Sequence, residues 1–491
     1  MSPEPVRIGV LGCGNVGAAL VEQIRTRADV IAGRTGLRLE VARVAVRSVS
    51  KDRPVELPPG TLTHDAAELV QDPGIDVVVE VIGGIEPARE LTLAAMRAGK
   101  PVVSANKELL ANHGAELFAA AEAAGVDLLF EAAVGGGIPF IRPLRESLAG
   151  ERIDRVMGIV NGTTNYILTR MTEGGADYAE ALGGAQRLGY AESDPTADVE
   201  GHDAAAKAAI IASIAFGARV TAGEVYNQGI SGVTPADISY ARKLGYAIKL
   251  LAIAERHPAS GAPTGAGAGA GAGNGSGGGV NGDGPAGGAA RGNGAEHAGP
   301  TTLAGAAGEP GQVGGPIAVS NTDEISVRVH PAMIPRTHPL ASVNDSFNAI
   351  FVEGESVGEL MFYGRGAGGA PTASAVLGDL IDAAANRAKG SHASVGALAR
   401  ARLRPIDEVR SAYYLNLDVI DRPGVLAAVA GAFGAHGVSI RSMEQEGLHG
   451  EARIVFITHE AREADMQATI HDLNKLDAVD RIASVLRVVG A

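Results

Sequence analysis

The chain has 491 residues, a formal net charge of −14 and 46% hydrophobic residues, which is enough for several domains with packed cores. The acidic balance argues against nucleic acid as a partner, and no apolar run is long enough to cross a bilayer. A single cysteine, Cys13, excludes an intramolecular disulfide framework and a CxxC metal site, and without a signal-like segment before Val6 we expect a cytoplasmic protein.

An apolar strand is expected at residues 6–11, followed at once by a glycine-rich loop (GCGNVG, 12–17) and a helical stretch. Strand, loop and helix in this order indicate a dinucleotide site, because glycines permit a tight turn and the N–H groups of the helix start bind a pyrophosphate. The alternative is a glycine turn that only packs. The expected cofactor contacts are Gly12, Gly14, Asn15, Val16 and Gly17.

The second strand, 39–46, ends in Arg47, and Lys51 follows. A site that prefers NAD usually has an acid at this strand end, whereas basic residues suit the 2′-phosphate of NADP. We therefore favour NADP(H) over NAD(H). Arg47 could equally be a solvated residue at a strand end.

Further strands are expected at 76–82, 101–103 and 127–130, with a helix at 87–98. In open parallel sheets, ligands bind beyond the carboxyl ends of the strands. This rule places Ile82, Ser104 and Lys107 at the cofactor, with Lys107 also facing a substrate. The competing interpretation is that Lys107 is a surface lysine at the start of the next helix.

The second half opens with a strand at 153–160 and a polar helix start, NGTTNYIL. Asp203 and Lys207 are the only charges on the apolar helix GHDAAAKAAIIASIAF and stand four residues apart, so they share one face. Charged side chains occur in a protein interior only if they are paired with an opposite charge or take part in binding or catalysis. Glu192 and Asp198 precede them, and carboxylates with an ammonium suit a site that binds an amino acid and protonates a carbonyl oxygen. The alternative is a structural ion pair.

At this point the sequence closely resembles the homoserine dehydrogenase family over nearly its whole length. The resemblance rests on GCGNVG, SANKELLA, EAAVGGGIP, NGTTNYIL, GYAESDPTADVEGHDAAAK and RVHPAMIPRTHPLASV, in family order. It implies reversible, NAD(P)H-dependent reduction of L-aspartate 4-semialdehyde to L-homoserine, on the route to threonine, methionine and isoleucine. It also implies a homodimer or homotetramer with no membrane partner.

The resemblance also implies roles for single residues. Lys207 would be the proton donor or acceptor, Asp203 and Glu192 would bind the substrate with support from Asp198, and Lys107 would lie beside substrate and cofactor. Gly189 and Gly368 would contact the cofactor. A monovalent cation, Na⁺ or K⁺, would be held mainly by backbone carbonyls at Glu131, Val134, Gly136 and Ile138.

The expected fold is α/β and has three parts. A Rossmann-type domain covers 1–140 and is completed by about 365–390. An α+β substrate-binding and dimerisation domain covers 141–364, with a Gly/Ala-rich insertion at 258–316 that we expect to be disordered. A linker at 391–411 leads to a βαββαβ unit at 412–491.

The final unit should contain strands at 413–420, 439–446, 452–458 and 479–488 and helices at 425–436 and 463–473. The run LDVIDRPGVLAAVAGAFGAHGVSI resembles an ACT domain, a module that binds amino acids. Asp421 and Gly424 are the expected effector contacts, with L-threonine as the effector by family analogy. A tail that only dimerises is the alternative. For the whole chain, the alternative is a non-catalytic amino-acid sensor that retains a dinucleotide-binding fold, although such a sensor would not need Lys207.

Overall fold

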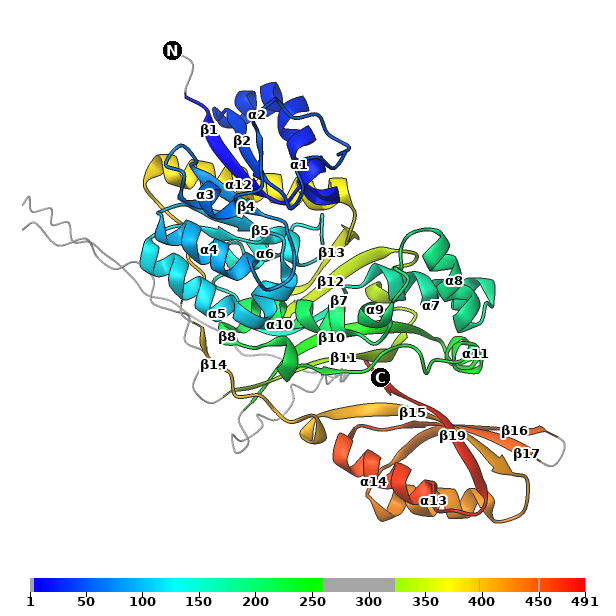
Figure 1. Cartoon of the computed structure of the whole chain (residues 1–491). Helices are drawn as coiled ribbons and strands as arrows, with labels where there is room; N and C mark the ends of the chain where they lie inside the picture. The colour runs from blue at the N-terminus through cyan, green and yellow to red at the C-terminus, as the bar shows by residue number, and fades with distance from the viewer. Residues whose placement is uncertain (1–3, 259–322, 397, 449–450, 491) are drawn as a thin grey trace, which may run out of the picture. The chain divides into compact units, whose positions relative to one another are not determined.

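The computed structural model describes residues 4–258, 323–396, 398–448 and 451–490 (Figure 1). The predicted insertion 258–316 lies outside the described residues, apart from Pro258. The fold is α/β, with a parallel sheet in the N-terminal part, a mixed sheet in the central part and a C-terminal βαββαβ unit.

Six strands of the described chain form the parallel N-terminal sheet, in the order β3-β2-β1-β4-β5-β6. These strands are short and almost wholly apolar, as expected for a parallel sheet covered on both faces. The order reverses at β1 and β4, which is where doubly wound sheets bind nucleotides. The strands are β1 Val6–Leu11, β2 Leu39–Ala45, β3 Leu62–Thr63, β4 Val77–Glu80, β5 Val102–Ser104 and β6 Leu128–Leu129.

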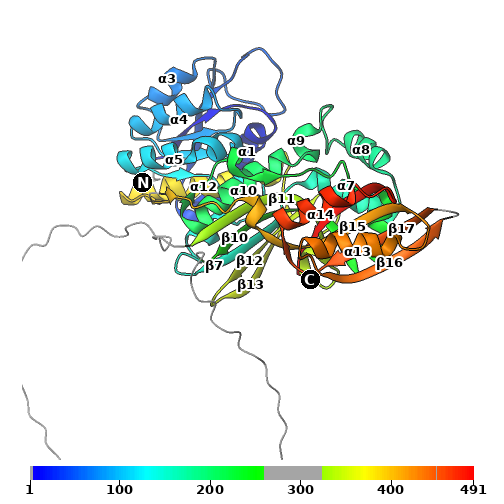
Figure 2. The same cartoon turned by 90° about the horizontal axis from the view of Figure 1, so that it is seen from below.

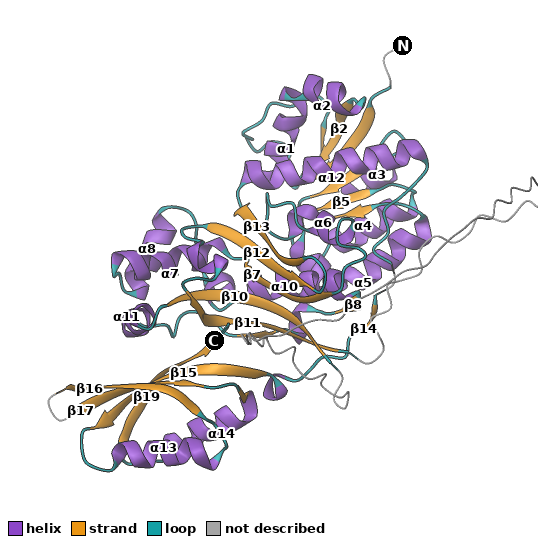
Figure 3. Ribbon diagram, turned by 180° about the vertical axis from the view of Figure 1, so that it is seen from behind, coloured by secondary structure: helices purple, strands orange, loops and turns teal. Residues whose placement is uncertain are grey.

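Helices cover both faces of this sheet: α1 Asn15–Thr26, α2 Ala28–Thr35, α3 Ala66–Gln71, α4 Ala88–Arg97, α5 Lys107–Ala124 and α12 Gly369–Lys389. Helix α12 comes from much later in the chain and packs beside α1 on the same face of the sheet (Figure 3). Its residues Val376, Leu380 and Ala383 join the core formed by Ile8 and Val10 of β1. Helix α12 thus contributes to the hydrophobic core of the first sheet.

The central part is built on a mixed sheet in which the strands lie in the order β13-β12-β7-β10-β11 (Figure 2). Strands β10 and β11 pair antiparallel along their whole length, from Tyr246 opposite Pro335 to His257 opposite Glu324. They flank the insertion and are neighbours in one sheet. The strands are β7 Ile153–Ile159, β10 Tyr246–His257, β11 Glu324–Pro335, β12 Phe347–Gly354 and β13 Gly358–Arg365.

Helix α10, His202–Phe216, packs against β7, β10 and β11 and also against α5 of the first part. The long apolar run predicted for this helix explains why it can be covered on several sides. The other elements are α6 Ile141–Arg145, α7 Gly162–Gly174, α8 Tyr178–Arg187, α9 Thr196–Val199, α11 Pro235–Lys243, β9 Tyr226–Asn227, and the pair β8 Ala218–Arg219 and β14 Ala399–Arg400.

The C-terminal unit has the predicted βαββαβ order, with both helices on the same face of its strands (Figures 1 and 3). One further short strand, β18, was not expected. The elements are β15 Arg410–Ile420, α13 Val425–Ala435, β16 Ile440–Leu448, β17 Glu451–Thr458, β18 Ala461–Arg462, α14 Glu463–Leu473 and β19 Val479–Val488. The sheet continues into the central sheet, because β19 pairs parallel with β11 at Ala332 and Met333.

Within the described ranges, no helix has both the length and the apolar character needed to span a membrane.

Candidate active site

The phosphate loop has the tight backbone packing that a dinucleotide site requires. A Cβ atom added at Gly17 would lie 2.3 Å from the carbonyl oxygen of Gly12, and one at Gly12 would lie 2.8 Å from that of Val81. Gly12 also has a φ of 103°, a backbone conformation that side chains disfavour. Helix α1 starts at Asn15 with no side-chain cap, which leaves its first N–H groups free for an anion. These features fit a bound pyrophosphate.

The buried carboxylate of Glu80 joins the two strand ends that we assigned to the cofactor. Its Oε1 atom accepts the backbone N–H of Ile82 at 3.0 Å, and its Oε2 atom accepts the Ser104 hydroxyl at 2.7 Å. Burial raises the pKa of Glu80, and these hydrogen bonds oppose the rise. Glu80 thus connects the loop after β4 to the end of β5.

The same network fixes the start of α5, where Lys107 stands. The Asn106 side chain caps α5 by accepting the N–H of Leu109 at 3.1 Å, and it donates to the carbonyl oxygen of Gly84 at 2.7 Å. Lys107 is therefore the first residue of a helix whose start is hydrogen-bonded to the loop after β4.

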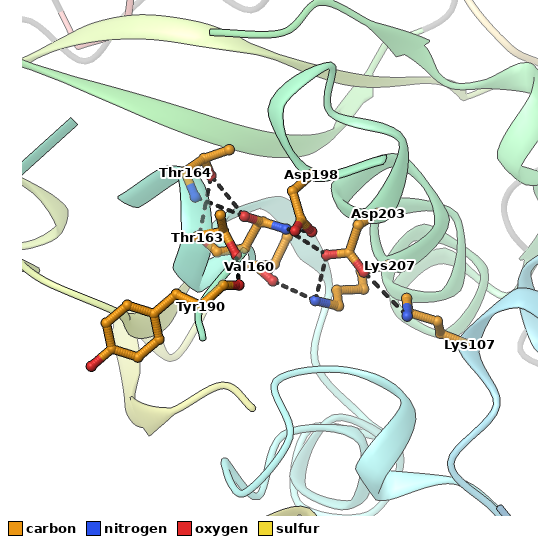
Figure 4. Close-up of polar contacts among 9 residues, drawn as sticks. Lys107, Val160, Thr163, Thr164, Tyr190, Asp198, Asp203 and Lys207 are labelled. Atoms are coloured by element: carbon orange, nitrogen blue, oxygen red, sulfur yellow. Dashed lines mark hydrogen bonds and ion pairs between the residues drawn. The ribbon is translucent and has the colours of Figure 1, made fainter. Parts of the chain in front are cut away.

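Lys107 and Lys207 meet at a single carboxylate, that of Asp203 (Figure 4). The Nζ atom of Lys207 lies 2.7 Å from Asp203 Oδ2, and that of Lys107 lies 3.3 Å from Asp203 Oδ1. Both side chains of the first pair are only 12% exposed, whereas Lys107 is 42% exposed. Packing of α10 on α5 brings these residues together from opposite parts of the chain.

Three further hydrogen bonds hold this cluster (Figure 4). Lys207 donates to the backbone oxygen of Val160 at 2.7 Å. The side-chain nitrogen of Asn161 donates to Asp198 at 2.7 Å and to Asp203 at 2.9 Å. The predicted residues Asp198, Asp203, Lys107 and Lys207 are thus gathered at one place.

The two aspartates of the cluster differ in their electrostatics. Burial alone would raise the pKa of Asp203, but Lys207, Lys107 and the Asn161 amide together lower it to about 2. Burial and the charge of Asp203 raise the pKa of Asp198 above its ordinary value, against a hydrogen bond from Asn161. Asp203 is therefore a permanent anion near neutral pH.

Glu192 is the predicted site residue that the structure does not bring into this cluster. It is exposed, and its backbone oxygen accepts a hydrogen bond from Gln186 at 3.2 Å. The segment that carries it is held at Tyr190, whose carbonyl oxygen accepts the hydroxyl of Thr163 at 2.7 Å. Gly189, in the same segment, has a φ of 74°.

Of the other expected cofactor contacts, Gly368 lies near the phosphate loop and Arg47 is exposed just beyond β2. Gly368 precedes α12, and a Cβ atom at the next residue, Gly369, would lie 3.0 Å from the carbonyl oxygen of Asn15. The charge of Arg53 partly offsets the rise that burial causes in the pKa of Cys13, which places Arg53 close to the loop as well.

The residues expected around a cation form a buried turn. The Glu131 carboxylate accepts the backbone N–H groups of Ile141 and Arg142, each at 2.7 Å, and is also bonded by that of Phe140. Val134, Gly136 and Ile138 lie in the turn that follows, where Gly136 has a φ of 56°. No group of three or more His, Cys, Asp or Glu residues in the described part could hold a metal. The Glu131 carboxylate is thus committed to backbone N–H groups.

In the C-terminal unit, Asp421 and Gly424 lie in the turn between β15 and α13. This turn borders a cavity of about 400 Å³, which Gln445 and Ile454 also line. Gly424 has a φ of 91° and precedes the first residue of α13. The two expected effector contacts therefore share one cavity.

Sequence reasoning did not assign Asn161 or Glu80 to the site. Each had a local signal: Asn161 precedes a glycine at a helix start, and Glu80 is a lone acid at the end of an apolar strand. What those signals could not show is the partner, because Asn161 contacts residues 37 and 42 positions away.

Comparisons with known proteins agree along the chain. Residues 139–279 and 290–381 match the family described as "Homoserine dehydrogenase", 12–131 match "Homoserine dehydrogenase, NAD binding domain", and 413–478 match "ACT domain". A homoserine dehydrogenase of Corynebacterium glutamicum is 47% identical over 98% of this chain and 95% of its own length.

Solved structures give the same result. The crystal structure of a homoserine dehydrogenase from Thiobacillus denitrificans is 38% identical and has a TM-score of 0.82, covering 99% of this chain and 98% of that one. A hyperthermophilic archaeal homoserine dehydrogenase in complex with NADPH is 25% identical, with a TM-score of 0.56, over 78% of this chain and 98% of that one.

Proposed function

Because the chain belongs to the homoserine dehydrogenase family and is an NAD(P)-dependent oxidoreductase, we propose that it interconverts L-aspartate 4-semialdehyde and L-homoserine through the Lys107, Asp203 and Lys207 cluster. The observation that carries this assignment is the contact of two lysines, from different parts of the fold, with one buried carboxylate. Such a cluster can hold a charged substrate and move a proton at a carbonyl oxygen.

Lys207 is the proposed acid and base. Two of its three ammonium protons are used by Asp203 and Val160, and one remains for the substrate oxygen. In the reducing direction Lys207 protonates the oxygen on which negative charge develops, and in homoserine oxidation it takes the hydroxyl proton. Bound NADPH would supply the hydride.

Asp203 and Lys107 are proposed to bind and orient the substrate. Asp203 carries a permanent charge that attracts the substrate ammonium and keeps Lys207 in place. Lys107, which is more exposed, is suited to a substrate carboxylate. Asp198 supports Asp203 through Asn161, and Glu192 would reach the substrate ammonium from the segment after Gly189.

NADP(H) is the proposed cofactor, held at its pyrophosphate by Gly12, Gly14, Asn15, Val16 and Gly17, with Ile82, Ser104, Gly189 and Gly368 around it. Arg47 and the nearby Lys51 and Arg53 supply positive charge suited to a 2′-phosphate, which favours NADP(H) over NAD(H).

A monovalent cation is the second proposed cofactor. Because the Glu131 carboxylate is committed to backbone N–H groups, Na⁺ or K⁺ would bind chiefly to the carbonyl oxygens of Val134, Gly136 and Ile138, with Glu131 contributing charge. Such an ion would order the turn that contains Val134, Gly136 and Ile138.

L-threonine is the proposed effector, bound in the cavity beside Asp421 and Gly424. A carboxylate and a glycine turn at a helix start can recognise an amino acid through its ammonium and carboxylate groups. The homodimer or homotetramer expected for the family belongs to the same proposal.

The first test is NADP-dependent oxidation of L-homoserine by the purified chain in monovalent salt, with and without L-threonine. Activity that threonine suppresses would support both the reaction and the effector. Activity indifferent to threonine would support the reaction and remove the effector. A folded protein with no activity on NADP or NAD would contradict the proposed reaction.

A further inference from the structure

We propose that Asn161 is a positioning residue for catalysis, whose side-chain amide holds Asp198 and Asp203 together and thereby sets the contact between Asp203 and Lys207. The inference rests on the proposed function, because it concerns the same cluster. Asn161 is 5% exposed and stands at the start of α7.

The orientation of this amide is determined by its oxygen. Asn161 caps α7: its Oδ1 atom accepts the backbone N–H of Thr164 at 2.9 Å and the Thr164 hydroxyl at 3.0 Å. Two donors at this position require an oxygen, so the NH₂ group must point the other way, toward the carboxylates. The capping bond therefore orients the NH₂ group of Asn161 toward Asp198 and Asp203.

The NH₂ group of Asn161 donates to both Asp198 and Asp203 and so holds the two carboxylates close together. With bonds of 2.7 Å to Asp198 and 2.9 Å to Asp203, the two accepting oxygen atoms cannot lie farther apart than the combined length of those bonds. Two carboxylates at such a distance repel each other, and a donor shared between them offsets part of that repulsion. Asn161 provides that donor, and it carries no charge that would neutralise Asp203.

Val160, the residue before Asn161, holds Lys207, the other member of the ion pair with Asp203. Lys207 donates to the backbone oxygen of Val160, while Asn161 donates to the Asp203 oxygen that also accepts from Lys207. Two consecutive residues thus fix both the ammonium and the carboxylate. A shift at the start of α7 would change the direction of the remaining Lys207 proton.

This arrangement requires asparagine specifically. Aspartate and serine are both good helix caps, so either could keep the bond to Thr164. Aspartate would present a third carboxylate instead of a donor. Serine is too short to reach both acids from the cap position. The variants Asn161→Asp and Asn161→Ser therefore preserve the helix while removing the amide donor.

Steady-state oxidation of L-homoserine with NADP is compared for the wild type, Asn161→Asp and Asn161→Ser. Both variants should lose at least ~10-fold in kcat/KM, the size expected for one hydrogen bond to a charged group. Asp177→Asn is the matched control, because Asp177 caps α8 through the N–H of Glu180 and is outside the site. It should retain wild-type activity.

The pH profile separates positioning from a structural role. The charged groups of the cluster around residue 161 and Lys207 are Asp198 from α9, Asp203 from α10 and, through Asp203, Lys107 from α5. A third carboxylate among them makes proton release from Lys207 harder, so the acidic limb of kcat/KM in Asn161→Asp should move up by at least ~0.5 pH unit. The serine variant adds no charge and should show no upward movement. A merely structural defect would lower activity without moving the limb.

A readout without turnover keeps this inference separate from the proposed reaction. Lys207 is labelled with acetic anhydride at fixed pH and quantified by peptide mass spectrometry against the exposed Lys389. In Asn161→Asp the label should enter Lys207 at least ~3-fold more slowly than in the wild type, because the added charge holds the ammonium proton. Loosened packing would give faster labelling.

Unchanged or faster labelling of Lys207 in Asn161→Asp would overturn the proposal, as would wild-type kcat/KM in Asn161→Ser. If the wild-type chain does not oxidise homoserine, the proposed reaction fails, and the labelling result still decides the role of Asn161.

Discussion

Replacing Arg487 with methionine should destabilise β19, the strand of the C-terminal unit that pairs with the central sheet. Arg487 lies on β19, where it pairs with Ala332 of β11, and its side chain is only 6% exposed. Its guanidinium lies 2.8 Å from the carboxylate of Glu463, which is 5% exposed. It also donates to Gln228 at 3.1 Å and to Tyr226 at 3.2 Å, both in the central part.

The expected magnitude follows from what the substitution leaves behind. Removing one partner of a buried ion pair costs about 3–5 kcal/mol, because the other charge stays buried without its partner. Here the Glu463 carboxylate keeps the Tyr413 hydroxyl at 2.8 Å and the Gln467 amide at 2.8 Å. We therefore expect the lower end, about 3 kcal/mol, which corresponds to a change of roughly 150-fold in an opening equilibrium.

Hydrogen exchange followed by mass spectrometry measures this opening directly. Peptides from β19 and β11 should exchange roughly 100-fold faster in Arg487→Met than in the wild type. Arg481→Met is the matched control, because Arg481 lies on the same strand and pairs with Asp418, but its side chain is 65% exposed. An exposed pair contributes below about 1 kcal/mol. Equal exchange rates of the β19 peptides in the two variants would show that the buried Arg487–Glu463 pair stabilises β19 no more than the exposed Arg481–Asp418 pair.

Three further outcomes are expected. Lys207→Ala should lower kcat at least ~100-fold with little change in NADPH affinity, since the general acid is lost while the phosphate loop is intact; near-normal turnover in steady-state kinetics would remove the assignment. Gly17→Ala should abolish detectable NADPH binding in a fluorescence titration, because its Cβ atom would lie 2.3 Å from the Gly12 oxygen, whereas Gly33→Ala, with open space around it, should bind normally. Burial raises the pKa of Asp379 to about 7. The folded state therefore binds a proton more tightly than the unfolded state, and this group costs stability as the pH rises from about 4 to 7. Thermal melts should show Asp379→Asn gaining about 2 kcal/mol relative to wild type between pH 5 and 8, and a pH-independent difference would contradict the shift.

Much of the fold could be predicted because its signals are local. The strand at 6–11, the helix at 463–473 and the strand at 479–488 have the predicted bounds. In each case an apolar pattern ends at a glycine, a charge or a turn, and such patterns need no knowledge of distant residues.

The connection between β11 and β19 could not be predicted in the same way. Its register pairs Ala332 with Arg487 and Met333 with Val488, and both strands would look the same if they were partnered elsewhere. Two short stretches separated by more than 150 positions leave no local pattern in one sequence. The sequence therefore indicated separate units, and the structure joins their sheets.

The candidate site falls between these two cases. Asp203 and Lys207 are four residues apart on one helix, so their pairing follows from helical geometry. The contact of Asp203 with Lys107 depends on the packing of α10 on α5. The family resemblance placed both residues at the substrate but did not predict this contact. The role of Asn161 needed the direction of one amide, which only coordinates supply.

The late arrival of α12 has a consequence for synthesis of the protein. The last strand of the parallel sheet ends at Leu129, but the helix that covers one face of that sheet begins only at Gly369, about 240 residues later. At about 5–20 residues per second, a ribosome needs roughly 12–50 s to make the intervening chain. During that time Ile8 and Val10 have the cover of α1 and α2 but lack that of α12, while the whole central sheet is being made. The nascent N-terminal sheet thus exposes apolar surface of the kind that chaperones bind, and a gene fragment that ends after the sheet would leave the surface covered by α12 exposed permanently.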